Sequence, residues 1–217
     1  MTPNITEQEA IELQQKLAKK VVKKGKLTNI RYVAGTDVAY AKNKKRLIAA
    51  VVVIDIRTME VVEQVVVEDE ERFPYIPGLF SFREMPPLMK AFEQLKIRPD
   101  VVIIDGQGLA HPRRFGLACH FGVHYNIPSI GCGKTRLIGT FAPVGEKRGD
   151  FSPLVDGEEL IGSVLRTQDG INPLFISIGH KVDLKTARQI VLKLCTQYRQ
   201  PETTRKADEL ANRMLKG

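Results

Sequence analysis

The chain has 217 residues, of which 43% are hydrophobic and 27% charged, and its 33 basic and 25 acidic side chains give a formal net charge of +8. This length and composition can bury one substantial core, so we expect a single domain over residues 1–217 rather than several. The basic excess on a mixed surface favours a polyanionic partner such as a nucleic acid.

The cysteines and the N-terminal sequence indicate the cellular compartment to expect. The three cysteines, Cys119, Cys132 and Cys195, form no CxxC pair and cannot all pair within the chain, which argues against a disulfide scaffold and against a cysteine zinc site. The N-terminal stretch TEQEAIELQQKLAKKVVKK has no apolar core of signal-peptide length, and the longest apolar runs are of strand length. We therefore expect a cytoplasmic monomer that neither spans nor enters a membrane.

The first part of the chain predicts a helix over about 6–24, followed by a β meander. Three β-rich segments predict strands: 31–40, 46–56 and 60–68. The polar turns between them, AKNKK (41–45) and RTM (57–59), are short, so these strands are expected to pair antiparallel.

Beyond the meander, an irregular Pro/Gly stretch at 73–82 leads into a predicted helix at 83–96, whose two prolines would fit its first turn. The later predicted elements are, in order, strand 100–105, helix 111–126, strand 127–132, further strands 159–167 and 173–179, and a C-terminal helix 184–199. Alternating strands and helices imply parallel pairing with right-handed crossovers.

Three antiparallel strands followed by two parallel ones, flanked by helices and extended by C-terminal strands and a helix, are the layout of the ribonuclease H-like α/β fold. The central sheet is expected to be mixed and five-stranded. In this architecture an acid on the first strand, here Asp37, lies beside an acid that closes the fourth, here Asp105. Both have apolar neighbours, where an ionised carboxylate is costly without a cation or hydrogen bonds. A single Asp at a strand end is often a cap or turn former, but the pair favours a functional site.

Four segments, GTDVAY, PYIPGLFSFRE, DGQGLAHPRRFGLACHFG and GCGKTRL, resemble the endonuclease V family, and the resemblance covers about 30–215. It implies a DNA repair endonuclease that recognises deoxyinosine, which is deaminated adenine, and hydrolyses the second phosphodiester bond on its 3′ side with Mg²⁺ or Mn²⁺. It also implies catalytic positions at Asp37, Glu84, Asp105 and Lys134, and a further metal-site position at Asp208.

The same side chains suit phosphodiester hydrolysis on chemical grounds. Oxygen ligands from Asp37, Glu84 and Asp105 could hold Mg²⁺, which would position water and neutralise charge on the phosphoryl oxygens. Lys134 would add positive charge at the scissile phosphate or help to orient the water. Its sequence GCGKT resembles the end of a P-loop, but position 128, where that motif needs Gly, is Pro, so we exclude a nucleotide triphosphatase.

Glycines beside Asp105 predict a pocket for an extruded base. Gly106 and Gly108 would leave bare backbone, whose N–H and C=O groups could read the base, although a simple sharp turn is the alternative. A pocket of this kind could admit hypoxanthine and reject adenine by its different hydrogen-bonding edge. The resemblance implies that seven residues surround the flipped hypoxanthine: Gly78, Phe80, Gly106, Gly108, Gly116, Gly131 and Leu137.

The turn PYIPG (74–78) is a candidate DNA wedge. Its two prolines limit its freedom, and Tyr75, Ile76 and Pro77 form its tip. The resemblance assigns this segment to strand separation, whereas ordinary core packing of Tyr75 is the alternative.

In HPRR, a proline just before a helix would leave N–H groups facing a phosphate, and Arg113 and Arg114 could contact backbone oxygens. On a helix the two arginines cannot both point inward, so one could instead pair with an acid. His111 could contact DNA or support the loop. We favour support over metal binding because Mg²⁺ prefers oxygen ligands.

His120 and His124 have the i, i+4 spacing of a zinc pair, but Phe121 stands where the zincin motif needs Glu, and we interpret both as structural.

Two rival functions remain open at this stage. A similar fold could serve an inosine-specific endoribonuclease acting on inosine-containing RNA, because the sequence does not fix the sugar preference. A non-catalytic nucleic-acid-binding protein is the second alternative. The set of three acids argues against it, since pure binding gains nothing from carboxylates that face phosphates.

Overall fold

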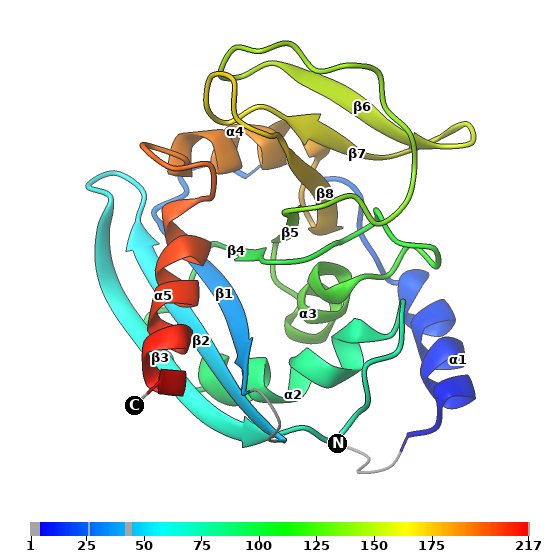
Figure 1. Ribbon diagram of the computed structural model, residues 1–217, viewed down its shortest axis with the longest axis vertical. Coiled ribbons are helices and arrows are strands. Elements are labelled where there is room, and N and C mark those ends of the chain that lie inside the picture. The colour runs from blue at the N-terminus through cyan, green and yellow to red at the C-terminus, as the bar shows by residue number, and fades with distance from the viewer. Residues whose placement is uncertain (1–4, 26, 42–44, 217) are drawn as a thin grey trace.

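The computed structural model describes residues 5–25, 27–41 and 45–216; residues 42–44 of the predicted turn at 41–45 lie outside these ranges. Within them, one eight-stranded sheet has helices on both faces (Figure 1). The strands are β1 (Tyr32–Tyr40), β2 (Arg46–Asp55), β3 (Glu60–Glu70), β4 (Val101–Ile104), β5 (Ser129–Gly133), β6 (Phe151–Asp156), β7 (Glu159–Leu165) and β8 (Leu174–His180). The helices are α1 (Glu7–Ala18), α2 (Phe80–Phe92), α3 (Leu117–Tyr125), α4 (Leu184–Leu194) and α5 (Glu202–Lys216).

The sheet has the strand order β3-β2-β1-β4-β5-β8-β7-β6. Strands β1 to β3 form the predicted antiparallel meander, and β4 and β5 join β1 in parallel, as predicted. The ribonuclease H-like fold class is therefore confirmed. The sheet is larger than the five strands expected, because β8 pairs antiparallel with β5 and carries β7 and β6 with it.

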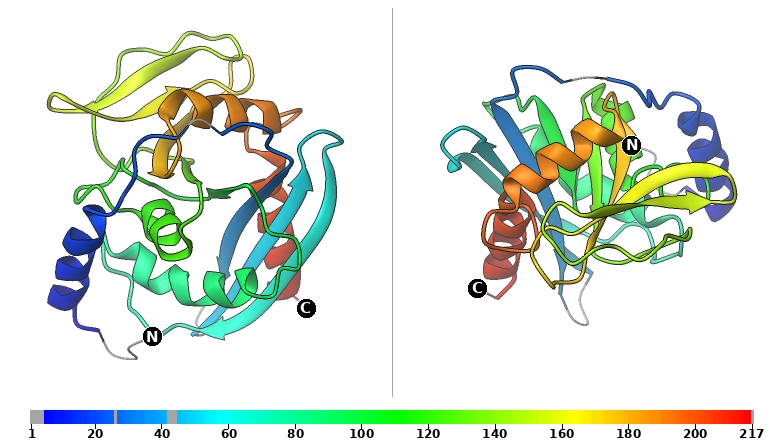
Figure 2. Two further views of the ribbon diagram at one scale, coloured as in Figure 1. Left: turned by 180° about the vertical axis from the view of Figure 1, so that it is seen from behind. Right: turned by 90° about the horizontal axis from the view of Figure 1, so that it is seen from above.

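Strand β6 was missed by the sequence interpretation. It contains Pro153 and alternates exposed and buried residues, and it forms a hairpin with β7 through a turn at Gly157. Proline is tolerated at the edge of a sheet, where its missing N–H costs no ladder bond. The β6–β7 hairpin projects beyond the rest of the sheet (Figure 2).

Two apolar clusters fill the space on either side of the sheet. Helices α4 and α5 pack on one face and α2 and α3 on the other, with α1 against α3. Strand β2 alternates between the two clusters and is buried along nearly its whole length, which is why its sequence reads as an unbroken apolar run. In the part of the chain that the structure describes, no helix is both long and apolar enough to cross a membrane, and all three cysteines are free and buried.

The first helix is shorter than predicted. It ends at Ala18, not at residue 24. The following backbone is bonded instead to the end of β8 and the residue after it, where the Val22 N–H donates to His180 Nδ1 and the Lys181 N–H donates to the Val22 carbonyl. Tertiary hydrogen bonds thus replace helical ones.

Helix α2 begins at Phe80, three residues before the predicted start, so Pro86 and Pro87 lie in its interior and not in its first turn. Helix α3 begins at Leu117 and not at 111, because Arg114 has a left-handed backbone (φ 54°) and Gly116 is an extended N-cap. The HPRR segment is therefore a turn that precedes the helix. Its proline does not sit directly before a helix, as the phosphate-facing interpretation required.

The predicted C-terminal helix 184–199 is also shorter, since α4 ends at Leu194. A separate helix, α5, follows Pro201 and lies against β1 and β2. Its close approach depends on Gly35 of β1, where a Cβ would come within 2.4 Å of the Thr203 backbone.

Candidate active site

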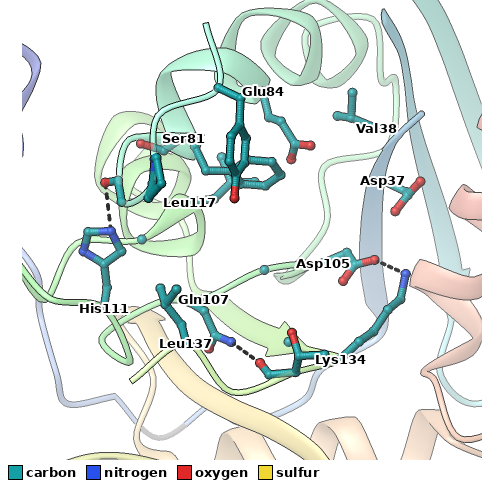
Figure 3. A pocket seen from close by; sticks show the side chains of 18 of the residues that line it. Asp37, Val38, Ser81, Glu84, Asp105, Gln107, His111, Leu117, Lys134 and Leu137 are labelled. Atoms are coloured by element: carbon teal, nitrogen blue, oxygen red, sulfur yellow. Dashed lines mark hydrogen bonds and ion pairs between the residues drawn. The ribbon is translucent and has the colours of Figure 1, made fainter. Parts of the chain in front are cut away.

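The parallel pairing of β1, β4 and β5 brings Asp37, Asp105 and Lys134 together. Thr36 of β1 is in register with Ile104, the last residue of β4, so the residues that follow them, Asp37 and Asp105, lie at the same level of the sheet. Lys134 directly follows β5, and its ammonium Nζ lies 2.5 Å from Asp105 Oδ2. Figure 3 shows the three side chains converging at one side of a cavity.

The carboxyl of Asp37 is destabilised in its charged form. Burial raises its pKa to about 8, and the neighbouring Asp105, which lies within hydrogen-bonding reach, adds to the shift. For Lys134, burial lowers the pKa, but Asp105 and the other carboxylates outweigh it and the net pKa is raised. The lysine therefore stays charged and balances part of the negative charge.

Glu84 reaches the same cavity from helix α2, across the cavity from Lys134 (Figure 3). It is 4% exposed, and burial raises its pKa well above the usual value, although the hydroxyl of Tyr40, which donates to Glu84 Oε1, acts in the other direction. The guanidinium of Arg83 lies 4.5 Å from the Tyr40 ring centroid. Glu84 is thus held by a tyrosine from the end of β1.

Asp208 enters the site from helix α5. It lines the cavity together with Asn212, one helical turn later, and its charge contributes to the raised pKa of Asp37. The carboxylates expected at this site, Asp37, Glu84, Asp105 and Asp208, therefore all line one cavity although they come from four different elements.

A hard divalent cation suits these donors. No three Asp, Glu, His or Cys side chains of residues 5–25, 27–41 and 45–216 form a complete metal cage as they stand. Mg²⁺, however, usually keeps several waters and takes only one or two protein carboxylates together with substrate phosphates. The pair Asp37 and Asp105 supplies two such oxygen donors, and a cation beside them would relieve the repulsion that raises the pKa of Asp37.

The cavity has a volume of about 580 Å³. Beside the acids it is lined by apolar and small residues: Val38, Tyr75, Pro77, Gly78, Phe80, Gly106, Gly116, Leu117 and Leu137. Polar residues line the rest, and a cavity of this size that combines apolar walls with polar groups suits a small molecule or an extruded base. Leu137 is half exposed at the mouth.

Five of the seven residues expected around a base line this cavity, and two do not. Gly108 and Gly131 lie beneath it, in close backbone packing: a Cβ on Gly108 would come within 2.1 Å of the Ile178 carbonyl oxygen, and one on Gly131 within 2.4 Å of the Gly108 nitrogen. The Gly108 N–H is also bonded to the Ser177 hydroxyl. These two glycines fix the 106–108 loop against β5 and β8 and do not face the cavity.

The turn at 74–78 overhangs the cavity. Tyr75 is 64% exposed and touches Phe80 edge-on at 6.5 Å between ring centroids, so it is not a core residue. Ile76 instead packs with Ala10 of α1 and Leu79 and does not line the cavity. The expected wedge thus has Tyr75 and Pro77 at its tip.

The carbonyl of Gly78 anchors this turn. It accepts hydrogen bonds from Gln14 Nε2 (3.0 Å) and Arg113 Nη2 (2.7 Å) and lies 3.0 Å from His111 Nε2. Burial lowers the pKa of His111 to about 4, helped by the charge of Arg113, so the ring is neutral near pH 7. His111 and Arg113 therefore support the loops around the cavity in this structure.

Arg114 forms ion pairs with Asp156 and Glu159, each at 2.7 Å, away from the cavity. The two arginines of HPRR are thus occupied by protein groups, and neither guanidinium lines the cavity. His120 is partly buried and contacts the rings of Phe82 and Phe115, and burial lowers its pKa to about 4, in keeping with a structural role.

Two lining residues, Gln14 and Tyr40, were given no role by the sequence interpretation. Gln14 is completely buried in α1 and bonds Gly78, Phe115 and Arg113 across the molecule. Tyr40 was part of the motif GTDVAY, but its bond to Glu84 spans 44 residues. Such pairs are invisible to local patterns.

Comparison with known proteins gives a consistent picture. The sequence profile of endonuclease V matches residues 15–209. Endonuclease V of Dehalococcoides mccartyi is 48% identical over 212 residues, which is 98% of this chain and 95% of that protein. The crystal structure of endonuclease V from Streptomyces avermitilis superposes with a TM-score of 0.94 at 42% identity, over 99% of this chain and 95% of that one. Endonuclease V of Ciona intestinalis, solved with a 24mer DNA containing an inosine followed by a ribo-adenosine, gives a TM-score of 0.86 at 28% identity, over 94% and 95% of the two chains.

Proposed function

The chain belongs to the endonuclease V family, a family of phosphodiester-cleaving nucleases, and we propose that it recognises deoxyinosine in DNA and hydrolyses the second phosphodiester bond on the 3′ side of that lesion with Mg²⁺ or Mn²⁺. The observation that carries the proposal is a single cavity in which Asp37, Asp105 and Lys134 meet at one side while apolar side chains line the opposite part. We expect the enzyme to act in the cytoplasm as a monomer.

In this proposal the acids and the lysine divide the work at the scissile phosphate. Asp37 and Asp105 would hold the cation, with Glu84 and Asp208 close by. The cation would supply charge neutralisation and an activated water. Lys134 would then place its ammonium against the phosphoryl oxygens, where negative charge builds in the transition state.

The opposite part of the cavity would receive the extruded base. Gly106 leaves bare backbone beside Asp105, and Phe80, Leu117 and Leu137 supply apolar walls. Tyr75 is exposed at the mouth, where it could occupy the place that the base leaves in a duplex. The turn that carries Tyr75 is held by Gln14, His111 and Arg113, so it would keep its shape when it enters the stack.

The test is an endonuclease assay on matched single-stranded DNA and RNA oligonucleotides, each with one inosine, with and without Mg²⁺. We expect Mg²⁺-dependent nicking of the DNA directly 3′ to the nucleotide that follows inosine, and no nicking of a control strand with adenine in place of inosine. Faster cleavage of the RNA would favour the endoribonuclease instead. Binding without cleavage of either strand would favour the non-catalytic alternative.

A further inference from the structure

A second cleft lies on the other side of the segment that carries Lys134. It has a volume of about 500 Å³ and is lined by Lys134, Thr135, Arg136, Phe141, Val144, Arg166, Asn172, Pro173, Phe175 and Arg199. Its first three lining residues, 134–136, also line the catalytic cavity. The two hollows are therefore neighbours, separated by one short segment after β5, at the start of the loop that leads to the β6–β7 hairpin (Figure 1).

The cleft is strongly basic. Four of its lining residues are Lys or Arg, and among the residues that the structure describes no Asp or Glu lines it. Arg199 and Arg166 are fixed by backbone carbonyls: Arg199 Nη2 donates to Lys134 (2.7 Å) and Pro173 (2.8 Å), and Arg166 donates to the carbonyls of Gly145, Val144 and Ile171. These two arginines give the cleft a fixed positive field. Arg136 is exposed, and its one hydrogen bond within the described part of the chain, from Nη1 to the Gly139 carbonyl at 3.2 Å, lies at the surface, where a phosphate could replace it.

The second cleft is also lined by an exposed aromatic ring, that of Phe141. Phe141 is 36% exposed, and its ring is fixed edge-on against the buried Phe175, with centroids 5.7 Å apart. The guanidinium of Arg136 lies 5.9 Å from its centroid. An exposed aromatic ring beside cations that can follow a phosphate backbone is the combination by which proteins hold single-stranded nucleic acid, because each base can stack on the ring.

We propose that this second cleft binds the nucleotide directly 3′ to the scissile phosphate, with its base stacked on Phe141 and the phosphate beyond it near Arg136. This rests on the proposed function. Along the substrate the order is inosine, one nucleotide, the scissile phosphate and the downstream nucleotide. On the protein, Lys134 is bonded to Asp105 of the acid cluster and also lines the second cleft. A strand whose scissile phosphate lies at Lys134 can therefore continue into the second cleft.

The test uses two single-stranded inosine DNA oligonucleotides that differ only in the nucleotide directly 3′ to the scissile phosphate, which is thymidine in one and an abasic analogue in the other. For the wild type we expect kcat/KM to be about tenfold lower on the abasic strand, the effect of one lost base–aromatic stack. The Phe141→Ala enzyme should lose about tenfold on the thymidine strand and match the wild type on the abasic strand. Phe141→Tyr keeps the ring and should behave as the wild type.

Phe151→Ala is the matched control, because Phe151 is a 49% exposed phenylalanine outside both cavities, packed on Arg188. It should leave both strands unaffected. The affinities of the same two strands are measured in Ca²⁺, with the strands recovered to verify that they are intact.

Equal nicking of both strands by the wild type, or equal losses on both strands for Phe141→Ala, would overturn the second cleft as a nucleotide site and leave the proposed function standing. An enzyme that nicks neither strand would instead refute the proposed function. The Ca²⁺ affinities then still decide about the cleft: a preference for the thymidine strand that Phe141→Ala abolishes supports it, and no such preference contradicts it.

Discussion

Replacing Asp37 by Asn should stabilise the metal-free enzyme at alkaline pH while it abolishes cleavage. The carboxyl of Asp37 is buried beside Asp105, with Glu84 and Asp208 close by, and only the charge of Lys134 compensates. Asparagine keeps the size and hydrogen-bonding capacity of the side chain but never becomes charged. The substitution thus removes the cost of a buried charge together with a metal-binding oxygen.

The magnitude follows from the pKa of Asp37, which is 3.8 for an unperturbed Asp and about 8 in the folded protein. Because the pKa of Asp37 is higher in the folded than in the unfolded protein, its contribution to stability is fully present below its pKa in the unfolded chain. That contribution is lost as the pH rises towards its pKa in the folded protein. Each pH unit within this window costs up to about 1.4 kcal/mol, so raising the pH from 6 to 8 should cost on the order of 2 kcal/mol. For a chain of this size that is a fall in Tm of roughly 5 °C.

The assay is thermal unfolding in EDTA at pH 6 and pH 8. The Tm of the wild type should fall more than that of Asp37→Asn over this range, and the difference between the two isolates Asp37 from other titrating groups. Glu60→Gln, on the exposed edge strand β3, removes one negative charge far from the site and should follow the wild type. In Mg²⁺, Asp37→Asn should nick inosine DNA at least about a hundredfold more slowly. Parallel falls in Tm for wild type and Asp37→Asn would refute a buried, destabilised carboxylate.

Asp105→Asn should largely abolish nicking in Mg²⁺ but leave the affinity for inosine DNA in Ca²⁺ intact or higher, since one carboxylate no longer repels the phosphate. Nicking rates and a gel-shift titration check this, and loss of both nicking and binding would show that the 105–108 loop has only a structural role. Tyr75→Ala should weaken binding to inosine in duplex DNA more than in single strands, because unstacking costs a few kcal/mol only where a stack exists; equal losses in a titration of both substrates would count against a wedge. Gln14→Ala should lower the free energy of unfolding in urea by about 2 kcal/mol, because it leaves the buried Phe115 carbonyl and Arg113 Nε without their partner; an unchanged midpoint would show that the bonds from α1 are dispensable.

Much of the fold could be predicted from local sequence signals. The meander β1 to β3 and the buried strands β4 and β5 are marked by apolar runs and short turns, and the rules for crossovers leave few ways to join them. The juxtaposition of Asp37 and Asp105 follows from that topology, because parallel strands in register place equivalent ends side by side. The same signals failed where tertiary hydrogen bonds or packing decided the outcome, as at the end of α1 and the start of α3.

By itself, then, the sequence determined the order of elements, the ribonuclease H-like class and the acids at the strand ends, because hydrophobic periodicity and turn chemistry act over a few residues. Only the tertiary structure decided that Asp208, which the family resemblance had implied, reaches the cavity on a separate helix α5, that Tyr40 holds Glu84, and that Gln14 anchors the turn at Gly78 from 64 residues away. These contacts depend on close backbone approaches, such as that of Thr203 to Gly35, and on buried polar groups that must find partners wherever the folded chain places them.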